Sequence, residues 1–479
     1  MVGSSRKKRR SVRRVILWIL VAAGGFYFLF PQHRKETERP FTWEQMTLTR
    51  KDRVLILAPH PDDETLGCGG VIQYARERKL PLRVVFLTYG DNNQWSFLVY
   101  RKRPVFSPKT AQRMGLVRRN EALAAARDLG LAPDQLTFLG YPDFGALNIW
   151  DAHWGDRPPF RSVLTRVTEV PYPNALRPGT PYKGEEVLQD LKTVLREFRP
   201  TKVFVSHPAD HNPDHQALYL FTRVALWDLE TEMKPEVYPY LIHFKRWPKP
   251  KGYRPSRMLE PPSFFRGEIP WKVYRLSEAE GIQKRSALRE HKTQYSYSAK
   301  YLLSFVGPNE LFGDFPPIAL RPVSSEISLL SNGMEGSEET SEELTDRERA
   351  AFVGFEERFV KLDGNDLVLS IKFSRPLAET VGASVHVFGY RSDRPFSEMP
   401  KLRIQFGAIG HEVYDQDRKL PEGTLRVSRT PKRLTIRVSL QALGNPEKIL
   451  TSAQTSLGDV PLDWVSWRVL ELPPFAEKA

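Results

Sequence analysis

Apolar and polar residues follow two different periods along this chain of 479 residues, and the change of period divides it into two parts. In the first part, apolar runs such as Val54-Leu-Ile-Leu-Ala58 alternate with stretches in which apolar residues recur every three or four positions. The stretch from Glu185 to Phe198 is one of these, because its apolar residues share one helical face. Alternating strands and helices predict an α/β domain at residues 48–322, with a Rossmann-like, largely parallel sheet.

The second part alternates with a period of two, which is the pattern of strands with one buried face. Its alternating runs are separated by turns rich in Pro, Gly and Asp, and they include Leu367–Phe373, Leu402–Phe406, Leu434–Leu440 and Val465–Val469. Residues 351–479 are therefore predicted to form an all-β sandwich. Because sandwiches support many functions, carbohydrate binding, a spacer role and a dimer contact all remain open for this domain.

An acidic segment joins the two parts. From Glu326 to Asp346 there are seven acidic residues and no basic ones, mixed with Ser, Gly and Thr. A segment of this composition cannot bury enough apolar surface to fold by itself. Residues 323–350 are therefore predicted to be a solvated, disordered linker.

The amino terminus has the pattern of a membrane anchor. A basic tail, residues 1–14, precedes residues 15–30, which are sixteen uncharged and mostly apolar residues. This length is close to the lower limit of about 17–25 residues for a helix that spans a membrane. A cleaved signal peptide is the alternative, because Val21-Ala-Ala23 suits a cleavage site. The apolar run continues to Phe30 and favours an uncleaved anchor.

The charges around this run predict its orientation. Seven basic residues precede it, whereas Arg34 and Lys35 follow closely behind it. Positive charge is retained preferentially on the cytoplasmic side of a membrane. We therefore expect a single-pass membrane protein with a cytoplasmic amino terminus and with its catalytic domain in the periplasm or outside the cell.

Composition narrows the range of partners and of covalent frameworks. The formal net charge is +14, and the seven basic residues of the tail supply half of it, so no nucleic-acid partner is expected. An anionic polymer of the cell surface remains a candidate partner. The single cysteine, Cys68, excludes an intramolecular disulfide framework.

The first candidate site follows directly after Ala58. His60-Pro-Asp-Asp-Glu64 lies where a strand gives way to a helix, and open α/β sheets bind ligands at the carboxyl ends of their strands. His60 and Asp63 are three residues apart and can face one metal ion, with Asp62 beside the position left for water. The alternative is that the acidic residues simply cap the following helix.

A second segment repeats this arrangement. Lys202-Val-Phe-Val205 has the pattern of a strand, and it is followed by Ser206-His-Pro-Ala-Asp-His-Asn-Pro-Asp-His215 and then by an apolar helical run. Two neutral imidazoles and one carboxylate form a set that leaves coordination positions open, which suits catalytic Zn²⁺ or another divalent metal. The alternative is that this segment is a polar surface loop. That alternative is weaker once both segments are considered together.

These segments resemble the PIG-L/LmbE-like family of zinc-dependent N-acetylglucosaminyl deacetylases. The similarity covers roughly residues 50–320, and its motifs occur in the family's order. The matching segments are Ala58–Gly70, Leu87–Asp91, Arg118–Ala126, Leu139–Asp143, Asn212–His215 and Thr293-Gln294, with Glu310–Phe312 behind them. The resemblance implies a bound zinc ion and hydrolysis of the acetamide of an N-acetylglucosamine-type sugar.

The resemblance also implies a role for each matching residue. The implied metal ligands are His60, Asp63 and His215. The implied catalytic residues are Asp62, as the general base that activates water, and Asp214, which orients a neighbouring group. Arg118 and Asp143 lie where the family contacts its substrate. An ion pair between Arg118 and Glu121 on a helix surface is the alternative for the arginine.

One position departs from the family pattern. The family usually carries a histidine three residues before its second metal-binding histidine, where it stabilises the oxyanion and protonates the leaving amine. Here that position is Asn212. An asparagine can donate a hydrogen bond but no proton, and loss of an oxyanion donor typically costs about 10²–10³ in rate. Either the adjacent His211 takes this role, or Asn212 fulfils part of it.

Together, these features predict a membrane-anchored N-deacetylase that acts on an N-acetylated glycan or glycoconjugate. The same site could hydrolyse another amide or an ester. A surface glycan-binding protein with a weakened enzyme domain is the alternative that Asn212 keeps open. The Pro- and aromatic-rich residues 233–271 predict a loop or lid, in which Trp247, Tyr253 or His243 stacks on a sugar or packs the loop onto its own domain.

Overall fold

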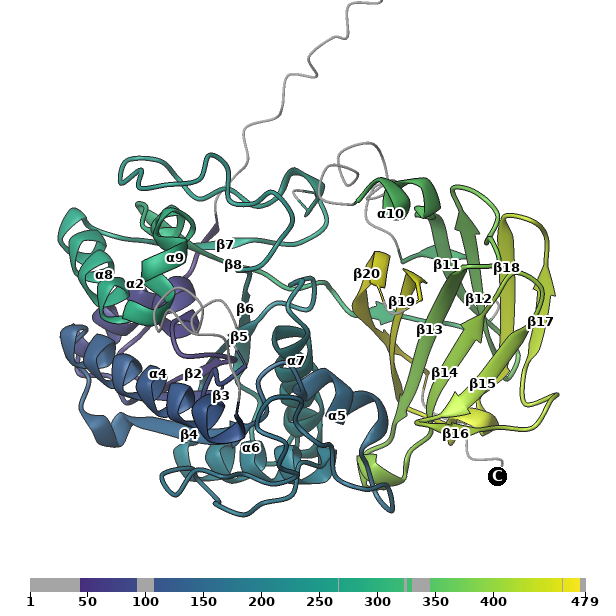
Figure 1. The fold of residues 1–479 in the computed structure, drawn as a ribbon, viewed down its shortest axis with the longest axis horizontal. Helices are drawn as coiled ribbons and strands as arrows, with labels where there is room; N and C mark the ends of the chain where they lie inside the picture. The colour runs from purple at the N-terminus through teal and green to yellow at the C-terminus, as the bar shows by residue number, and fades with distance from the viewer. Residues whose placement is uncertain are drawn as a thin grey trace, which may run out of the picture. The chain divides into compact units, whose positions relative to one another are not determined.

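The computed structural model describes residues 44–92, 107–265, 267–322, 325–329, 345–458 and 460–473 (Figure 1). Residues Trp43–Ala479 group into one compact unit, which contains both the α/β part and the β-rich part. The predicted tail and anchor in residues 1–30 lie outside the described residues, as do residues 330–344 of the predicted linker. Among the described residues, no helix combines the length and the apolar character that a membrane span requires.

An eight-stranded sheet forms the centre of the α/β part, with its strands in the order β1-β7-β8-β6-β5-β2-β3-β4. The strands are β1 (Glu44–Gln45), β2 (Val54–Ala58), β3 (Leu82–Thr88), β4 (Leu136–Tyr141), β5 (Lys202–Ser206), β6 (Glu236–Tyr240), β7 (Lys272–Arg275) and β8 (Asn309–Phe312). The strands from β2 to β6 pair in parallel, whereas β8 runs antiparallel to both β6 and β7. The sheet is therefore mixed, and the predicted parallel arrangement holds for its central strands.

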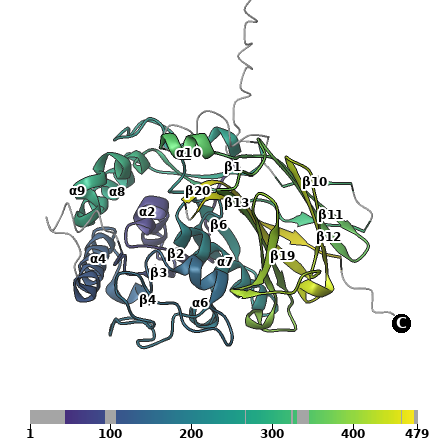
Figure 2. The ribbon, with the colours of Figure 1, turned by 45° about the vertical axis from the view of Figure 1, so that its right-hand side comes forward.

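Helices cover both faces of this sheet (Figures 1 and 2). On one side lie α2 (Asp63–Glu77), α4 (Pro108–Asp128), α8 (Glu278–Glu290) and α9 (Lys292–Leu302). On the other lie α5 (Ala146–Ala152), α6 (Gly184–Phe198) and α7 (Pro213–Asp228). The apolar face predicted from Glu185 to Phe198 is confirmed, since Val187, Leu191 and Val194 of α6 are buried. Because both faces are covered, β2 and β5 are buried along their whole length.

Two further sheets make up the β-rich part, in the orders β10-β11-β12-β18-β17 and β16-β15-β14-β13-β19-β20-β9. Their strands are β9 (Ile318–Ala319), β10 (Ile327–Ser328), β11 (Phe355–Asp363), β12 (Asp366–Phe373), β13 (Val381–Tyr390), β14 (Lys401–Phe406), β15 (His411–Asp415), β16 (Arg418–Lys419), β17 (Arg426–Arg429), β18 (Arg433–Ser439), β19 (Lys448–Leu457) and β20 (Val460–Glu471). A short helix, α10 (Asp346–Ala351), precedes β11.

One hydrophobic core lies between these two sheets, as in a β sandwich. Leu369 and Ile371 of the five-stranded sheet and Ile404 of the seven-stranded sheet are fully buried in it, at the positions that the period of two assigns to the core. The strands β9 and β10 precede residue 351, so the β-rich part also draws on residues that come before the predicted sandwich.

The opposite face of the seven-stranded sheet packs against the α/β part. A single cluster of buried side chains joins Trp150 of α5 and Phe221 of α7 to Phe388 of β13 and Trp467 of β20. The Trp150 ring lies 5.8 Å from the Phe388 ring and 6.3 Å from the Trp467 ring, measured between centroids. The seven-stranded sheet therefore carries one core on each face, and the second core fixes the β-rich part to the α/β part.

Candidate active site

The candidate site lies at the carboxyl ends of β2 and β5, which are neighbours in the sheet and run parallel. Each strand is a short apolar run that stops at a polar turn, and each turn leads into a helix, α2 after β2 and α7 after β5. Parallel neighbours place their carboxyl ends at the same edge of the sheet. The two motifs, far apart in the sequence, therefore meet at this edge.

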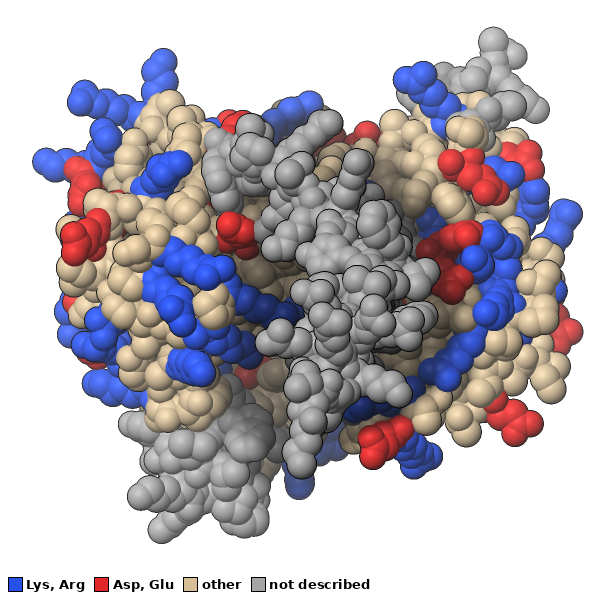
Figure 3. Space-filling view, turned by 90° about the horizontal axis from the view of Figure 1, so that it is seen from above, with Lys and Arg blue, Asp and Glu red and all other residues tan. Residues whose placement is uncertain are grey.

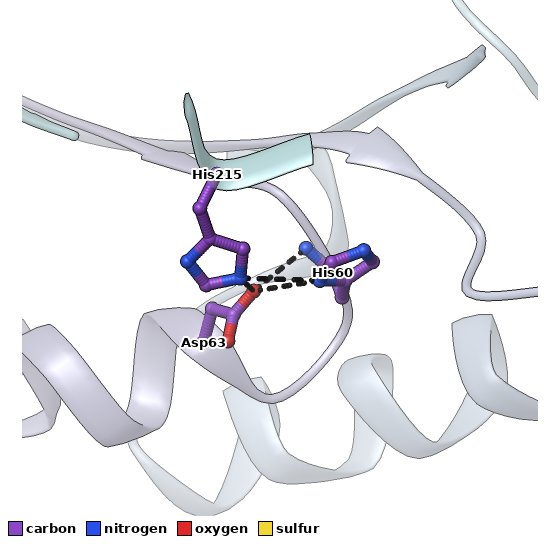
Figure 4. A group of neighbouring side chains, drawn as sticks. All are labelled: His60, Asp63 and His215. Carbon is purple, nitrogen blue, oxygen red and sulfur yellow. Dashed lines mark hydrogen bonds and ion pairs between the residues drawn. The ribbon is translucent and has the colours of Figure 1, made fainter. Parts of the chain in front are cut away.

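His60, Asp63 and His215 form the centre of the site, and all three are buried (Figure 4). The Oδ2 atom of Asp63 lies 3.1 Å from His60 Nδ1 and 3.1 Å from His215 Nε2. The two ring nitrogens are 3.3 Å apart. Three potential ligand atoms from two separate segments thus converge on one point.

The spacing of these atoms fits a zinc ion. Zinc ligands at about 2.0–2.1 Å in tetrahedral geometry are about 3.3–3.4 Å from one another. The three separations of 3.1, 3.1 and 3.3 Å are close to this value. Two imidazoles and one carboxylate also leave one coordination position for water or substrate. The three residues predicted as metal ligands are therefore together and suited to the metal.

Carboxylates hold the far side of each imidazole. His215 Nδ1 lies 3.0 Å from Asp210 Oδ2. His60 Nε2 lies 3.1 Å from Asp143 Oδ1 and 3.1 Å from Asp214 Oδ2. Metal-binding histidines are commonly oriented in this way by a carboxylate on the other ring nitrogen.

Asp214 has the orienting position that the family resemblance implies, and it is further fixed by hydrogen bonds from the backbone N–H groups of Phe144 and Ala146. Asp143 makes the same kind of contact with His60, and its Oδ2 accepts the backbone N–H of Asn92. Asp143 is buried, at 3% exposure. Asp143 therefore holds the ring of His60, one of the residues suited to bind the metal. Its predicted contact with substrate stays a prediction.

The same carboxylates raise the pKa of both histidines. Burial alone would lower the pKa of His215, but Asp210 and Asp63 raise it to about 9. Burial likewise opposes the charge of His60, but Asp143, Asp214 and Asp63 raise its pKa well above the ordinary value. An environment that stabilises a proton on these rings also attracts a divalent cation, which would take the proton's place.

Asp62 is held in a strained backbone conformation at the start of α2. Its φ is +129°, a region that residues with a side chain rarely adopt. Its side chain makes no capping hydrogen bond to the helix, and Arg118 Nη2 donates a hydrogen bond to its Oδ1 at 3.3 Å. Burial raises the pKa of Asp62 to about 7, although the charge of Arg118 opposes this effect. Asp62 therefore occupies the N-cap position of α2 without capping the helix through its side chain, and the first turn carries Asp63 and Glu64.

Arg118 is buried beneath the first motif. Its Nη2 also donates to the carbonyl oxygen of Pro61 at 2.8 Å, and its Nη1 donates to that of Gly90 at 3.1 Å. Glu121 instead accepts hydrogen bonds from the N–H and hydroxyl of Thr293, so a surface ion pair between Arg118 and Glu121 is wrong. The guanidinium thus positions the turn that carries Asp62, and its predicted contact with substrate stays a prediction.

The segment before His215 is arranged differently from the expectation. Asn212 caps α7, since its Oδ1 accepts the backbone N–H of Asp214 at 2.9 Å. The ring of His211 lies between Phe244, at 5.0 Å, and Trp464, at 5.2 Å, both measured between centroids. Among the described contacts, none joins the His211 side chain to His60, Asp63 or His215.

His243 lies beside the metal-binding residues, whereas the sequence pattern suggested for it only stacking on a sugar or packing of the loop onto its own domain. Its ring centroid is 4.8 Å from that of His215, and its backbone N–H donates to Asp210 Oδ2 at 2.9 Å. Burial lowers the pKa of His243 to about 4, so its ring is neutral at pH 7 and offers one N–H donor. No motif signals this residue, because it lies in the irregular segment after β6.

Phe144 is a second residue that sequence reasoning missed. Its side chain is 48% exposed and its φ is +56°. Its ring centroid lies 6.4 Å from that of His60, and its backbone N–H is bound to Asp214. An exposed aromatic ring fixed beside a polar site offers a flat apolar surface for the ring of a sugar.

The chain is similar to known deacetylases over part of its length. The PIG-L family model, described as GlcNAc-PI de-N-acetylase, matches residues 55–226. A 1D-myo-inositol 2-acetamido-2-deoxy-α-D-glucopyranoside deacetylase of Saccharopolyspora erythraea is 31% identical over 187 residues, which are 38% of this chain and 55% of that protein. A probable N-acetyl-α-D-glucosaminyl L-malate deacetylase of Bacillus anthracis is 29% identical over 177 residues, which are 34% of this chain and 71% of that protein. The match thus spans about half the length of the first relative.

Solved structures give a weaker likeness. The N,N'-diacetylchitobiose deacetylase of Pyrococcus horikoshii is 19% identical, with a TM-score of 0.32 over 52% of this chain and 75% of that chain. A deacetylase of the A40926 pseudoaglycone is 17% identical, with a TM-score of 0.35 over 55% of this chain and 96% of that chain. Likeness at this level does not bear on the activity.

Proposed function

We propose that the protein is a metal-dependent N-deacetylase, because residues 55–226 match the PIG-L family model. It would hydrolyse the acetamide of an N-acetylglucosamine-type sugar in a glycan or glycoconjugate. The observation that carries the proposal is the buried set of His60, Asp63 and His215, next to Asp62, whose side chain makes no capping hydrogen bond to α2. The two relatives, whose names describe deacetylases of N-acetylated glucosamine conjugates, support the choice of substrate.

The metal would be held by the two imidazoles and the Asp63 carboxylate. Zn²⁺ fits the donor set best, and another divalent ion would fit the same geometry. When bound, such an ion polarises a carbonyl group and lowers the pKa of water in the site. The carboxylates of Asp210, Asp143 and Asp214 keep the opposite ring nitrogens engaged, so that His60 and His215 present their free nitrogens to the ion.

Asp62 would act as the general base. Its carboxylate makes no capping hydrogen bond to α2 and is held by Arg118 through Oδ1, so that it can accept a proton from water. Asp62 takes a proton from the water, whose oxygen attacks the acetamide carbon. The C–N bond then breaks, the amine nitrogen receives the proton from Asp62, and acetate and a free amine are released.

His243 would supply the hydrogen bond that the family obtains from the position of Asn212. Its neutral ring is 4.8 Å from His215 and can donate one N–H to the oxyanion of the tetrahedral intermediate. The cap of α7 fixes Asn212 through its Oδ1, which is an acceptor, and His211 is packed between Phe244 and Trp464. Phe144 would support the sugar ring at the entrance of the site.

The decisive experiment measures acetate released by the zinc-loaded, full-length protein from a panel of N-acetylglucosamine glycans and glycoconjugates. We expect release by the parent protein and a loss of about 10²–10⁴ in rate for Asp62→Asn, as for a general base, with unchanged zinc content. Asp363→Asn, at an exposed carboxylate of the β-rich part, is the matched control. If the zinc-loaded parent releases acetate from no compound of the panel, the proposal is contradicted.

An O-acetylated sugar in the same panel tests the alternative ester hydrolase. Acetate from the ester, together with none from any amide, would replace the proposed N-deacetylase by an esterase with the same residues. Glycan binding without metal and without turnover would instead favour a binding protein. The intact metal-binding set speaks for an enzyme, although Asn212 departs from the family pattern.

The role of His243 has a separate test. We expect His243→Ala to lower kcat by about 10²–10³, the usual cost of losing an oxyanion donor, while bound zinc stays at the parental level. His411→Ala removes an exposed histidine of β15 and should leave kcat unchanged. A parental kcat for His243→Ala would return the role to Asn212 or His211.

We further propose, from the sequence pattern alone, that residues 15–30 anchor the protein in a membrane with its catalytic domain in the periplasm or outside the cell. The basic tail and the long uncharged run support this orientation. Protease added outside the cytoplasmic membrane should digest the catalytic domain of the full-length protein and spare a cytoplasmic marker. A catalytic domain protected as well as the marker would reverse the orientation.

A further inference from the structure

A large cavity lies next to the candidate active site, between the α/β part and the β-rich part. Its volume is about 1190 Å³. Its walls come from the loop at residues 244–264, from the start of α7 and from β19 and β20. Pockets that hold one drug-sized ligand measure about 300–1,000 Å³, so this cavity has room for more than one sugar ring.

Aromatic rings from both parts face each other in this cavity. The His211 ring lies 5.0 Å from Phe244 and 5.2 Å from Trp464, both in edge-to-face geometry. Trp464 belongs to β20, and its ring is only partly buried. Ser452, Gln454 and His386 line the wall beside it. Flat apolar rings beside hydroxyl, amide and imidazole groups can bind both the C–H faces and the hydroxyl groups of sugars.

The cavity begins within two residues of the metal-binding set. Pro213 and Gln216, on either side of His215 in α7, line it. His243 and Phe244 are consecutive, and the first lies against His215 while the second lines the cavity. Asp210 fixes this arrangement, because its Oδ2 contacts His215 and also accepts the backbone N–H of His243. The cavity therefore lies close enough to the metal-binding set to take sugars that follow the one at the metal.

Charge favours an uncharged glycan over a polyanion as the occupant. Lysine and arginine side chains are prominent on both halves of the face drawn in Figure 3. Inside the cavity, however, five basic and four acidic side chains line the walls. Such a mixed lining does not provide the single-sign field that a polyanion requires. Hydrogen bonding and ring contacts would then dominate recognition.

We propose that this cavity binds the sugar residues next to the N-acetylated sugar, so that the substrate is an oligosaccharide or a longer glycan. The inference rests on the proposed deacetylase function, and it assigns the β-rich part a share in substrate recognition through Trp464. Trp464 lies outside residues 55–226, the segment that the family model matches, so this wall is an addition to the shared domain.

The test compares N-acetylglucosamine oligomers of one to five residues as substrates of the full-length, zinc-loaded protein. We expect the parent kcat/KM to rise at least tenfold from the monomer to the pentamer. Trp464→Ala should raise the KM for the pentamer about tenfold and remove most of this preference, while kcat changes little. Phe244→Ala, on the opposite wall, should act in the same direction. Tyr414→Ala, an aromatic residue of β15 outside the cavity, should retain the parental preference.

Calorimetric binding of the pentamer to Asp62→Asn separates the two proposals. If turnover does not depend on oligomer length, or is unaltered in both Trp464→Ala and Phe244→Ala, the proposed binding of sugars in the cavity is contradicted. The proposed deacetylase function would then still stand. If the pentamer binds in a way that depends on Trp464, but the parent releases no acetate from any oligomer, the binding of sugars in the cavity is supported. The proposed deacetylase function would then be contradicted. If the pentamer does not bind to Asp62→Asn, the proposed binding of sugars in the cavity is contradicted.

Discussion

Asp210 determines how His215 can present its ring to a metal. Its Oδ2 lies 3.0 Å from His215 Nδ1 and accepts the backbone N–H groups of Ile242 and His243, at 3.0 and 2.9 Å. A carboxylate in this position raises the basicity of the imidazole and fixes its tautomer. We therefore predict that Asp210→Asn weakens zinc binding by about 10–100-fold, measured by competition with a chelator.

The control for this prediction is Asp363→Asn, which removes a carboxylate that pairs with Arg437 on the surface. It should leave the zinc dissociation constant unchanged. The thermal midpoint of apo Asp210→Asn shows whether the loop itself has been lost. Parental zinc affinity in a folded Asp210→Asn protein would exclude a role of Asp210 in metal binding.

Lys401 is a buried lysine at the contact between the two parts. Its Nζ donates to the carbonyl oxygens of Phe396 and Met399, at 2.5 and 2.9 Å, and lies 4.7 Å from the centroid of the Trp154 ring. Burial lowers its pKa from 10.5 to about 7, although Asp415 opposes this shift. Between these two pH values the unfolded chain binds more protons at this position than the folded protein. The contribution of Lys401 to stability therefore rises with pH in this window.

We predict that the free energy of unfolding of the parent, relative to that of Lys401→Met, increases between pH 7 and pH 9. The upper limit is about 1.4 kcal/mol per pH unit for one proton. Urea denaturation of both proteins at the two pH values measures the change, and other titrating groups cancel in the difference. A difference that is constant would show that Lys401 has an ordinary pKa, and one that decreases with pH would also contradict a lowered pKa.

The sequence predicts the site as far as its residues adjoin regular elements. His60 and Asp63 come directly after β2, and His215 lies in the first turn of α7, the helix that follows β5, so the strand and helix patterns bring them together. His243 and Trp464 carry no such signal, because one lies in an irregular loop and the other on a strand of the β-rich part. Their places depend on tertiary packing, which no local period reports.

At the scale of elements, α5 is short and yet central. Its Trp150 is fully buried and packs on Phe388 and Phe396 of the β-rich part, at centroid distances of 5.8 and 5.2 Å, and on Phe221 of α7 at 5.1 Å. We predict that Trp150→Ala lowers the free energy of unfolding by about 3–5 kcal/mol, because a large buried ring leaves a cavity. Urea denaturation of the full-length protein measures this loss.

Ile409→Ala is the control for Trp150→Ala, because the Ile409 side chain is 92% exposed. Its effect should stay within about 0.5 kcal/mol, as for other surface substitutions. A similarly small effect of Trp150→Ala would mean that the two parts do not depend on this contact.

Elements with a strong period were predictable, and those fixed by their neighbours were not. The buried face of α6 and the alternation in β12 appear directly in the sequence. The antiparallel strand β8 and the two-residue strands β9 and β10 are too short to show a period. β9 and β10 pair at the edges of their sheets and β8 pairs between β6 and β7, so tertiary contacts decide the places of all three.

At the scale of the whole molecule, the two parts share a core instead of being joined by a linker alone. One buried cluster runs from α5 and α7 into β13, β19 and β20. The ion pair of Arg157 with Asp417, at 3.0 Å, and the hydrogen bond from the Tyr390 hydroxyl to Asp228, at 3.2 Å, lie at the same contact. Loss of either part would expose the apolar surface of the other, so their folding should be coupled.

We therefore predict that both parts unfold in one transition. Hydrogen exchange followed by mass spectrometry at increasing urea concentrations should show peptides from β2 and β5 and peptides from β12 and β18 losing protection at the same midpoint. In Trp150→Ala the shared core is weakened, so the two midpoints should separate, whereas Ile409→Ala should keep them together. Separate midpoints in the parent would show that the β-rich part is an independent domain. The cavity between the two parts would then lack the rigid walls that a specific binding site requires.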